Sequence, residues 1–312
     1  MNDALVGYTG FVGGNLARSH SFNAQYNSKN IAEAFGTAPE LLIYAGMRAE
    51  KYLANSDPDA DFALVEEAFA NIQKIAPKNL VLISTVDVYQ FPMSVDENSP
   101  IQTEGLQAYG YHRYRLEQMV RNAYPEALIV RLPGLFGKGI KKNFIYDLMS
   151  VVPFMLKTEK YQELCKECPL VAQAYVPAKT GFVQLTSQSK EQRAELKSFY
   201  MQNDFNALCF TDSRAVYQFY DLSRLWDDIS AARLAGIKLL NLATEPVSAA
   251  EVYQAVRGQG FHNELAAPPV CYAMKSCYAE ILGGKNGYLC EKQEILSGIC
   301  DFVQAIEQEG TL

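Results

Sequence analysis

The segment "ALVGYTGFVGGNLA", residues 4–17, contains the pattern that decides the fold. A short apolar run precedes glycines at positions 7, 10 and 13, and a helical pattern begins at about Phe11. The first glycine permits a tight turn, the second lets a pyrophosphate approach the backbone, and the third lets the helix pack closely on the strand. The helix N-terminus then points at the anion. The segment therefore predicts a dinucleotide-binding strand–turn–helix unit; the alternative is a tight turn with no ligand.

Later apolar runs alternate with helical patterns, which is typical of a parallel sheet covered on both faces. We expect strands at 4–7, 41–46, 79–85, 127–132 and 237–243, and a weak strand at 24–26. Helices are expected from about Phe11, over 60–76 and over 107–123, with a short one at about 31–35. The handedness of parallel crossovers makes an α/β, Rossmann-type doubly wound parallel sheet the predicted fold.

The chain is long enough for two domains. Residues 1–145 are expected to form the nucleotide-binding domain, with the strand near 237–243 added to it. Residues 146–312 are expected to form a smaller, mostly helical substrate-binding region, partly interleaved with the first. Within it, residues 140–210 are predicted to be helical.

Composition narrows the class of protein. Of the 312 residues, 49% are hydrophobic and 20% charged, and the net charge is −7. An acidic chain argues against nucleic acid as the main partner, and no apolar stretch approaches the roughly 20 residues that span a bilayer. The N-terminus lacks the pattern of a signal peptide, and seven scattered cysteines fit reduced thiols, so we expect a cytoplasmic protein. One CxxC, Cys165 and Cys168, is weak evidence for metal, and we predict no metal site.

Four motifs occur in order: the glycine turn, "ISTVDVY" (83–89), "YGYHR" (109–113) and "RLPGLFGKG" (131–139). In this order they resemble the extended short-chain dehydrogenase/reductases, and more narrowly the nucleotide-sugar epimerase/dehydratase group. The resemblance covers residues 1–145 well and the rest loosely. It implies an NAD(P)-dependent oxidoreductase or epimerase that acts by hydride transfer on a sugar, nucleotide-linked in the named group.

The resemblance places the catalytic hydroxyl on Thr85 and the catalytic phenol on Tyr109. A tyrosine with its ordinary pKa near 10 is a poor base at neutral pH, and a fixed cation nearby lowers that pKa. Arg113 lies four residues after Tyr109, so both side chains leave one helix face.

Arg113 stands where the resembled group has lysine. Arginine supplies the charge, but it is planar and does not give up its proton. Three outcomes stay open: the site works in altered form, the chemistry has moved elsewhere, or the chain is a non-catalytic nucleotide- or sugar-binding protein on the same fold.

The predicted cofactor contacts start in the glycine turn, at Gly7, Thr9, Gly10, Phe11, Val12 and Gly13. The resemblance adds the loop at Ala45 and Gly46, and Pro133 near the nicotinamide.

The position about 20 residues past the first glycine, where an acid binds the ribose of NAD, is Asn27. Ser28 and Lys29 can receive a 2′-phosphate instead, so NAD or NADP is expected with a slight preference for NADP. Only 28 positions separate Gly13 from Leu41, so we expect one sheet edge of the resembled group to be missing.

Candidate substrate contacts are Arg48, Asp87, Lys141 and Arg214. Asp87 alone remains of the acidic pair that dehydratases of the group carry, and a loop-capping carboxylate is the favoured alternative. Lys51 can also meet phosphate or sugar groups. The expected partner is a small-molecule substrate. The resemblance also implies a homodimer through the helix over 60–76, whose apolar face equally suits packing on the sheet.

Overall fold

The computed structural model describes residues 2–178 and 181–310, and the chain divides into two compact units. The first unit comprises Met1–Ile140, Val216–Val247 and Cys271–Ile295. The second comprises Lys141–Ala215, Ser248–Val270 and Leu296–Leu312.

The first unit is built on a six-stranded sheet in the order β12-β5-β4-β3-β1-β2, in which every neighbouring pair is parallel. The strands are β1 (Asp3–Val6), β2 (Ala24–Tyr26), β3 (Leu41–Tyr44), β4 (Leu80–Thr85), β5 (Leu128–Leu132) and β12 (Leu239–Asn241). β1, β3, β4 and β5 are buried along their whole length, as strands covered on both faces must be. The predicted α/β fold with a parallel sheet is confirmed, including the late strand.

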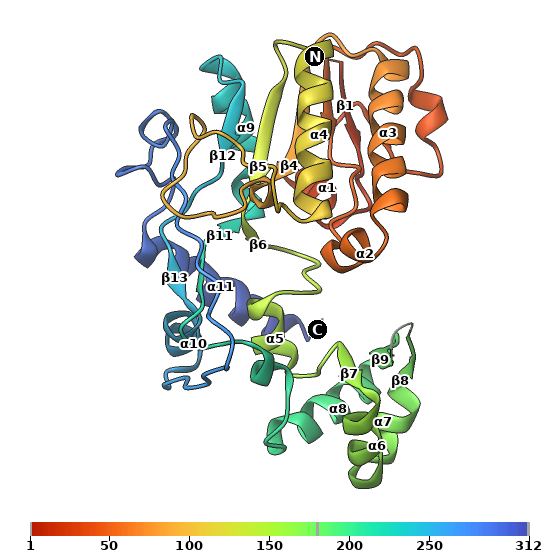
Figure 1. Ribbon diagram of the computed structural model, residues 1–312, viewed down its shortest axis with the longest axis vertical. Coiled ribbons are helices and arrows are strands. Elements are labelled where there is room, and N and C mark those ends of the chain that lie inside the picture. Colours follow the sequence, from red (N-terminus) through yellow and green to blue (C-terminus); the bar gives the residue numbers. More distant parts are fainter. Residues whose placement is uncertain (1, 179–180, 311–312) are drawn as a thin grey trace. The chain divides into compact units, whose positions relative to one another are not determined.

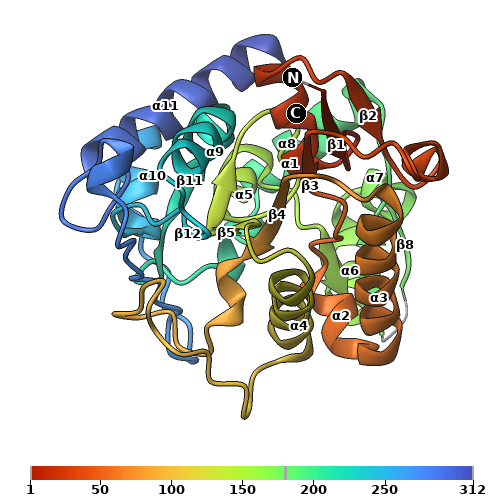
Figure 2. The ribbon, with the colours of Figure 1, turned by 90° about the horizontal axis from the view of Figure 1, so that it is seen from above.

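Helices cover both faces of this sheet (Figure 2). α3 (Pro58–Ile75) and α4 (Ala108–Ala123) lie on one face, and α1 (Phe11–Ser19) and α9 (Leu225–Leu234) lie on the other. α3 begins where Asp57 caps the Ala60 amide and Pro58 takes the first turn. Its apolar face packs against the sheet in one buried cluster with α4, through Val65, Ile72 and their neighbours.

The sheet is short on the side of β2. The common doubly wound order places two strands beyond the first strand, whereas within the described residues β2 alone lies there. The chain between β2 and β3 forms a single 3-10 turn, Ile31–Ala34, in place of a longer crossover. The predicted loss of one sheet edge is confirmed.

Shorter elements complete the first unit. β6 (Gly134–Phe136) pairs in parallel with β11 (Phe219–Asp221), and β10 (Val216–Tyr217) pairs with β13 (Val247–Ser248). The remaining short helices are α2 (Lys51–Ser56), η2 (Val86–Val88), η4 (Leu222–Arg224) and η5 (Glu280–Leu282).

The second unit combines helices with a small antiparallel sheet, β7-β9-β8 (Figure 1). Its elements are α5 (Phe144–Ser150), β7 (Met155–Lys157), α6 (Thr158–Glu167), α7 (Pro169–Ala174), β8 (Tyr175–Pro177), β9 (Phe182–Leu185), α8 (Lys190–Gln202), η3 (Ala207–Phe210) and α10 (Ala249–Arg257); α11 (Lys292–Glu309) ends in it. The purely helical prediction over 140–210 is therefore wrong in part, because strands of three or four residues are too short to show a period of two. No helix in the described ranges is both long and apolar enough to cross a membrane.

Candidate functional site

The glycine turn joins β1 to α1, and at two of its positions the backbone leaves no room for a side chain. Gly7 has φ +95°, and a Cβ there would lie 2.4 Å from the Ala45 carbonyl oxygen. A Cβ on Gly13 would lie 2.2 Å from the Gly7 carbonyl oxygen. Gly10 is the N-cap of α1 and makes no side-chain cap to it. The backbone amides of the first turn, including those of Phe11 and Val12, therefore have no intrahelical partner and are not covered by a capping side chain. The residues present fit a pyrophosphate at this turn.

The residues predicted on the adenine side follow β2 directly. The Gly7 amide donates to the Tyr26 carbonyl at 2.7 Å, which joins the end of β2 to the glycine turn. Asn27 accepts the Lys29 amide through its side-chain oxygen at 2.8 Å, while the Ser28 and Lys29 side chains are exposed. The structure thus places Asn27, Ser28 and Lys29 beside the glycine turn, where the Lys29 side chain faces solvent.

Two further predicted contacts lie at carboxyl ends of neighbouring strands. Ala45 follows β3 and donates its amide to the Val6 carbonyl at 2.9 Å, so it and Gly46 border the glycine turn. Pro133 follows β5, where Leu132 is in register with Thr85 of β4. Because carboxyl ends of parallel strands meet at one edge, the predicted cofactor residues share that edge.

Thr85 is the last residue of β4, and its hydroxyl is engaged with Asp87. The Thr85 hydroxyl donates to Asp87 Oδ2 at 3.2 Å and accepts the Asp87 amide at 3.2 Å. A Cβ on Gly110 would lie 2.0 Å from the Asp87 carbonyl oxygen. Glycine at this position in "YGYHR" therefore lets the first turn of α4 approach the end of β4, which brings Tyr109 close to Thr85.

The Arg113 side chain is buried, and both terminal nitrogens of its guanidinium are hydrogen-bonded. Its Nη1 and Nη2 donate to the two oxygens of Asp61 at 2.9 and 3.0 Å, and Nη2 also donates to the Arg48 carbonyl at 2.8 Å. The guanidinium carbon lies 4.6 Å from the centre of the Tyr109 ring. His112 Nδ1 lies 2.9 Å from the same Asp61 carboxylate. Arg113 is thus a fixed charge against the Tyr109 ring, and Arg48 contributes its backbone while remaining exposed.

Opposing effects set the protonation of the two groups. Burial raises the pKa of Tyr109 and Asp87 adds to the rise; Arg113, Lys51 and the hydrogen bond with Thr85 lower it, and the pKa remains above its ordinary value. Burial also disfavours the charged form of Asp61, but hydrogen bonds from Arg113 and His112 outweigh it and lower the Asp61 pKa. Tyr109 is therefore a neutral phenol near pH 7.

Sequence reasoning missed the partners that organise this site. The sequence assigns no role to Asp61, and it predicts for Lys51 only a contact with phosphate or sugar groups. Lys51 Nζ lies 2.6 Å from Asp87 Oδ1, and the Tyr272 hydroxyl lies 3.4 Å from the same oxygen. The available signal was the acidic run "DPDAD" (57–61) at the N-terminus of α3, which is also an ordinary helix start.

A buried ion pair supports the strands beneath the site. Arg131 of β5 donates to both oxygens of Glu117 of α4, at 2.9 and 2.6 Å, and to the Tyr89 hydroxyl at 2.8 Å. The Ser84 hydroxyl donates to Glu117 at 2.6 Å. Glu117 is 0% exposed, so these contacts replace the water it would otherwise bind.

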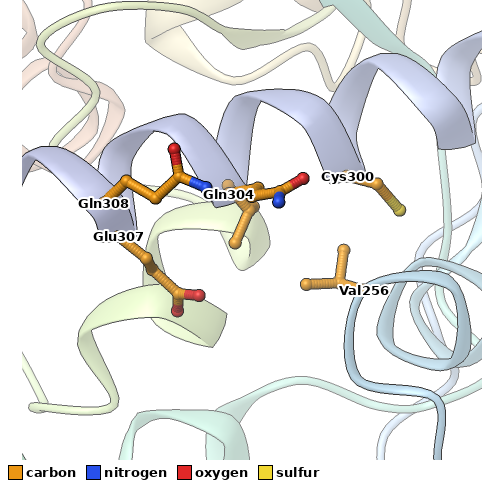
Figure 3. A pocket seen from close by; sticks show the side chains of 6 residues that line it. Val256, Cys300, Gln304, Glu307 and Gln308 are labelled. Atoms are coloured by element: carbon orange, nitrogen blue, oxygen red, sulfur yellow. The ribbon is translucent and has the colours of Figure 1, made fainter.

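Two predicted substrate contacts, Lys141 and Arg214, belong to the second unit. Arg214 forms a bidentate hydrogen bond with Asp212, at 3.0 and 2.7 Å, and an ion pair with Glu264 at 2.9 Å. The Arg214 guanidinium is thus already paired with two carboxylates, and the diphosphate of a substrate would have to displace them. The second unit also holds a hollow of about 440 Å³ between α10 and α11 (Figure 3). Its lining residues are Val256, Cys300, Val303, Gln304, Glu307 and Gln308, and none of them is a predicted site residue.

No family model matches the chain, and no curated protein matches it. Solved structures share its fold over nearly their whole length. A dTDP-4-dehydrorhamnose reductase from Bacillus anthracis in complex with NADP has a TM-score of 0.61 at 15% identity and covers 97% of each chain. A UDP-galactose 4-epimerase has a TM-score of 0.62 at 12% identity and covers 99% of each chain. A short-chain dehydrogenase/reductase superfamily protein from Agrobacterium tumefaciens with bound NAD has a TM-score of 0.61 at 13% identity, covering 98% of this chain and 97% of that one. At this identity the likeness shows the fold: the Rossmann-type α/β fold of these structures.

Proposed function

We propose that the protein is an NAD(P)-dependent oxidoreductase that acts on a carbonyl or hydroxyl carbon of a sugar, nucleotide-linked by preference. One observation carries the proposal. The glycine turn and Thr85 lie at the carboxyl ends of strands of one parallel sheet, and Tyr109 and Arg113 lie near the start of α4 beside them. The neighbours in fold include a dTDP-sugar reductase with NADP and a UDP-sugar epimerase, which supports this class.

The cofactor fits the turn at its pyrophosphate. The first-turn amides of α1 would hold that group, while Ala45, Gly46 and Pro133 would border the nicotinamide half. The exposed Lys29 and Ser28 favour the 2′-phosphate of NADP, since no carboxylate occupies position 27. When bound, the reduced cofactor supplies a hydride.

Reduction of a ketone is the direction that the resting site favours. Thr85 would hold the carbonyl oxygen by a hydrogen bond, and the Tyr109 phenol would give that oxygen a proton. Arg113 would then stabilise the phenolate through its position over the ring, at 4.6 Å. Since the pKa of Tyr109 is raised, the phenol is the resting form, which suits a proton donor more than a base.

A sugar dehydratase is the less favoured activity. The first position of the acidic pair is Val86, whose side chain carries no acid, and Asp87 is engaged by Thr85 and Lys51. The non-catalytic nucleotide- or sugar-binding protein remains the second candidate, because Arg113 and the short sheet edge both depart from the resembled group.

Calorimetric titration with NADPH and NADH tests the cofactor assignment directly. We expect NADPH to bind at micromolar or tighter dissociation constants, and Lys29→Met to weaken NADPH without weakening NADH. Lys78→Met is the matched control, because Lys78 is also exposed and pairs with Glu40 away from the turn. Equal failure of both nucleotides to bind would contradict the proposed function.

A further inference from the structure

Lys51 brings a second cation to Tyr109 from a different helix. Its Nζ lies 2.6 Å from Asp87 Oδ1, and the other Asp87 oxygen accepts the Thr85 hydroxyl at 3.2 Å. The close approach of Gly110 to the Asp87 carbonyl oxygen brings Tyr109 beside Thr85, and both Thr85 and the Lys51 charge lower the Tyr109 pKa. Polar contacts therefore link Lys51 through Asp87 to Thr85, beside Tyr109.

The position of Lys51 is fixed by α2. Asn55 lies one turn after Lys51, on the same helix face. Its side-chain oxygen accepts the Tyr109 amide at 3.0 Å, and its nitrogen donates to the Gln107 side chain at 2.8 Å. These two bonds tie α2 to the first turn of α4, so the placement of Lys51 near the site is built into the fold.

Arg113 cannot supply a mobile proton. Its guanidinium is committed to Asp61 and to the Arg48 carbonyl, and arginine does not deprotonate in proteins. Lys51 differs in both respects, because an ammonium can release a proton and because its side chain is 49% exposed to solvent. The two roles that a single lysine would combine, fixed charge and proton supply, are therefore divided between two residues.

We propose that Lys51 and Asp87 form the relay that returns a proton to Tyr109 after each reduction. This inference rests on the proposed function. The hydride of NAD(P)H forms the new C–H bond at the ketone carbon, the nucleotide is oxidised, and the Tyr109 O–H bond breaks to form the O–H bond of the alcohol. The Thr85 hydroxyl then gives its proton to the phenolate and takes one from Asp87, Asp87 takes one from the Lys51 ammonium, and the Lys51 amine takes one from water, which leaves hydroxide in the solvent. Lys51 acts through Asp87 and Thr85, so it is a positioning and relay residue.

Electrostatics keep the relay charged at rest. Burial lowers the pKa of Lys51, but the Asp87 carboxylate outweighs it and holds that pKa above its ordinary value. The groups that face the pair are Tyr109, Thr85 and Tyr272, all uncharged at neutral pH. The competing role for Lys51 is to hold a substrate phosphate, which would affect affinity and not proton supply.

The test compares Lys51→Ala, Lys51→Arg and the control Lys78→Met in NADPH oxidation with a nucleotide-linked keto sugar. We expect kcat to fall about tenfold or more in both Lys51 variants, with KM and the NADPH dissociation constant within twofold of wild type. Lys51→Arg keeps the charge without a releasable proton, so it should not restore the rate. Added ethylamine should restore Lys51→Ala in proportion to its protonated fraction, and Lys78→Met should match wild type.

Three results would overturn the relay: wild-type kcat in Lys51→Arg, wild-type kcat in Lys51→Ala, or a rise in KM with kcat unchanged. The last would assign Lys51 to a substrate anion. If Lys51→Ala fails to fold by thermal unfolding, Lys51→Arg and Lys51→Gln take its place in the same comparison. A wild-type protein that binds NADPH but oxidises none would instead overturn the proposed function, and the relay with it.

Discussion

The Arg113 guanidinium lies 4.6 Å from the centre of the Tyr109 ring, held there by both oxygens of Asp61. A lysine at position 113 could contact only one point of that carboxylate and would not stack on the ring. Asp61 thus holds the charge beside Tyr109 in a more rigid form than a lysine at position 113 would give.

Removing the Asp61 charge should destabilise the fold. Asp61→Asn leaves the Arg113 guanidinium buried without a counter-charge, and we expect a loss of about 3 kcal/mol in the free energy of unfolding. Urea denaturation at pH 7 measures it, with Asp59→Asn in the exposed first turn of α3 as the control. Equal stability of the Asp61 variant and wild type would show that the Asp61–Arg113 ion pair does not stabilise the fold.

The same pair predicts a pH dependence of stability. Because the folded-state pKa of Asp61 is lowered, the pair stabilises fully above the unfolded pKa near 3.9, and the contribution is lost as the pH falls through the folded value. Urea unfolding of wild type should therefore weaken toward acid more steeply than that of Asp61→Asn. Parallel curves for the two proteins below pH 4 would count against this assignment.

The buried pair Arg131–Glu117 should matter more for stability than for chemistry. Glu117→Gln leaves the 1%-exposed Arg131 without a full counter-charge, and we expect a loss of about 3–5 kcal/mol. Thermal unfolding measures the loss, and Glu66→Gln on the exposed side of α3 is the control. A shift no larger than that of the control would show that the pair is not needed.

The glycine turn should tolerate no methyl group at position 13. In Gly13→Ala the new Cβ would lie 2.2 Å from the Gly7 carbonyl oxygen, so the turn must open and NADPH binding should weaken at least tenfold. Gly14→Ala is the neighbouring control, since its nearest atom is 3.3 Å away and can yield slightly. Calorimetric titration of both variants with NADPH distinguishes the two causes. A clash inside the turn weakens binding only in Gly13→Ala, whereas a general loss of helix structure weakens it in both.

Much of this account could be read from the sequence, and the exceptions have physical reasons. Apolar runs placed β1, β3, β4 and β5 within a few residues, because buried strands carry a strong local signal, whereas the half-buried β2 gave only a weak one. The resemblance to a known family singled out Thr85 and Tyr109, and the structure places them near each other. Asp61 and Lys51 could not be found this way, because their partners Arg113 and Asp87 lie 52 and 36 positions away, and only the tertiary fold brings them into contact. The antiparallel sheet of the second unit was missed because its strands are three or four residues long.

The most direct test of the central claim is NADPH oxidation by wild type and Tyr109→Phe with a nucleotide-linked keto sugar. We expect wild type to turn over at a level rate from about pH 6 to 9, since the raised pKa keeps Tyr109 protonated throughout. We expect kcat to fall at least a hundredfold in Tyr109→Phe, with NADPH binding retained. A Tyr109→Phe variant as active as wild type, or a wild type that binds NADPH without any turnover, would contradict the assignment of Tyr109 as the proton donor.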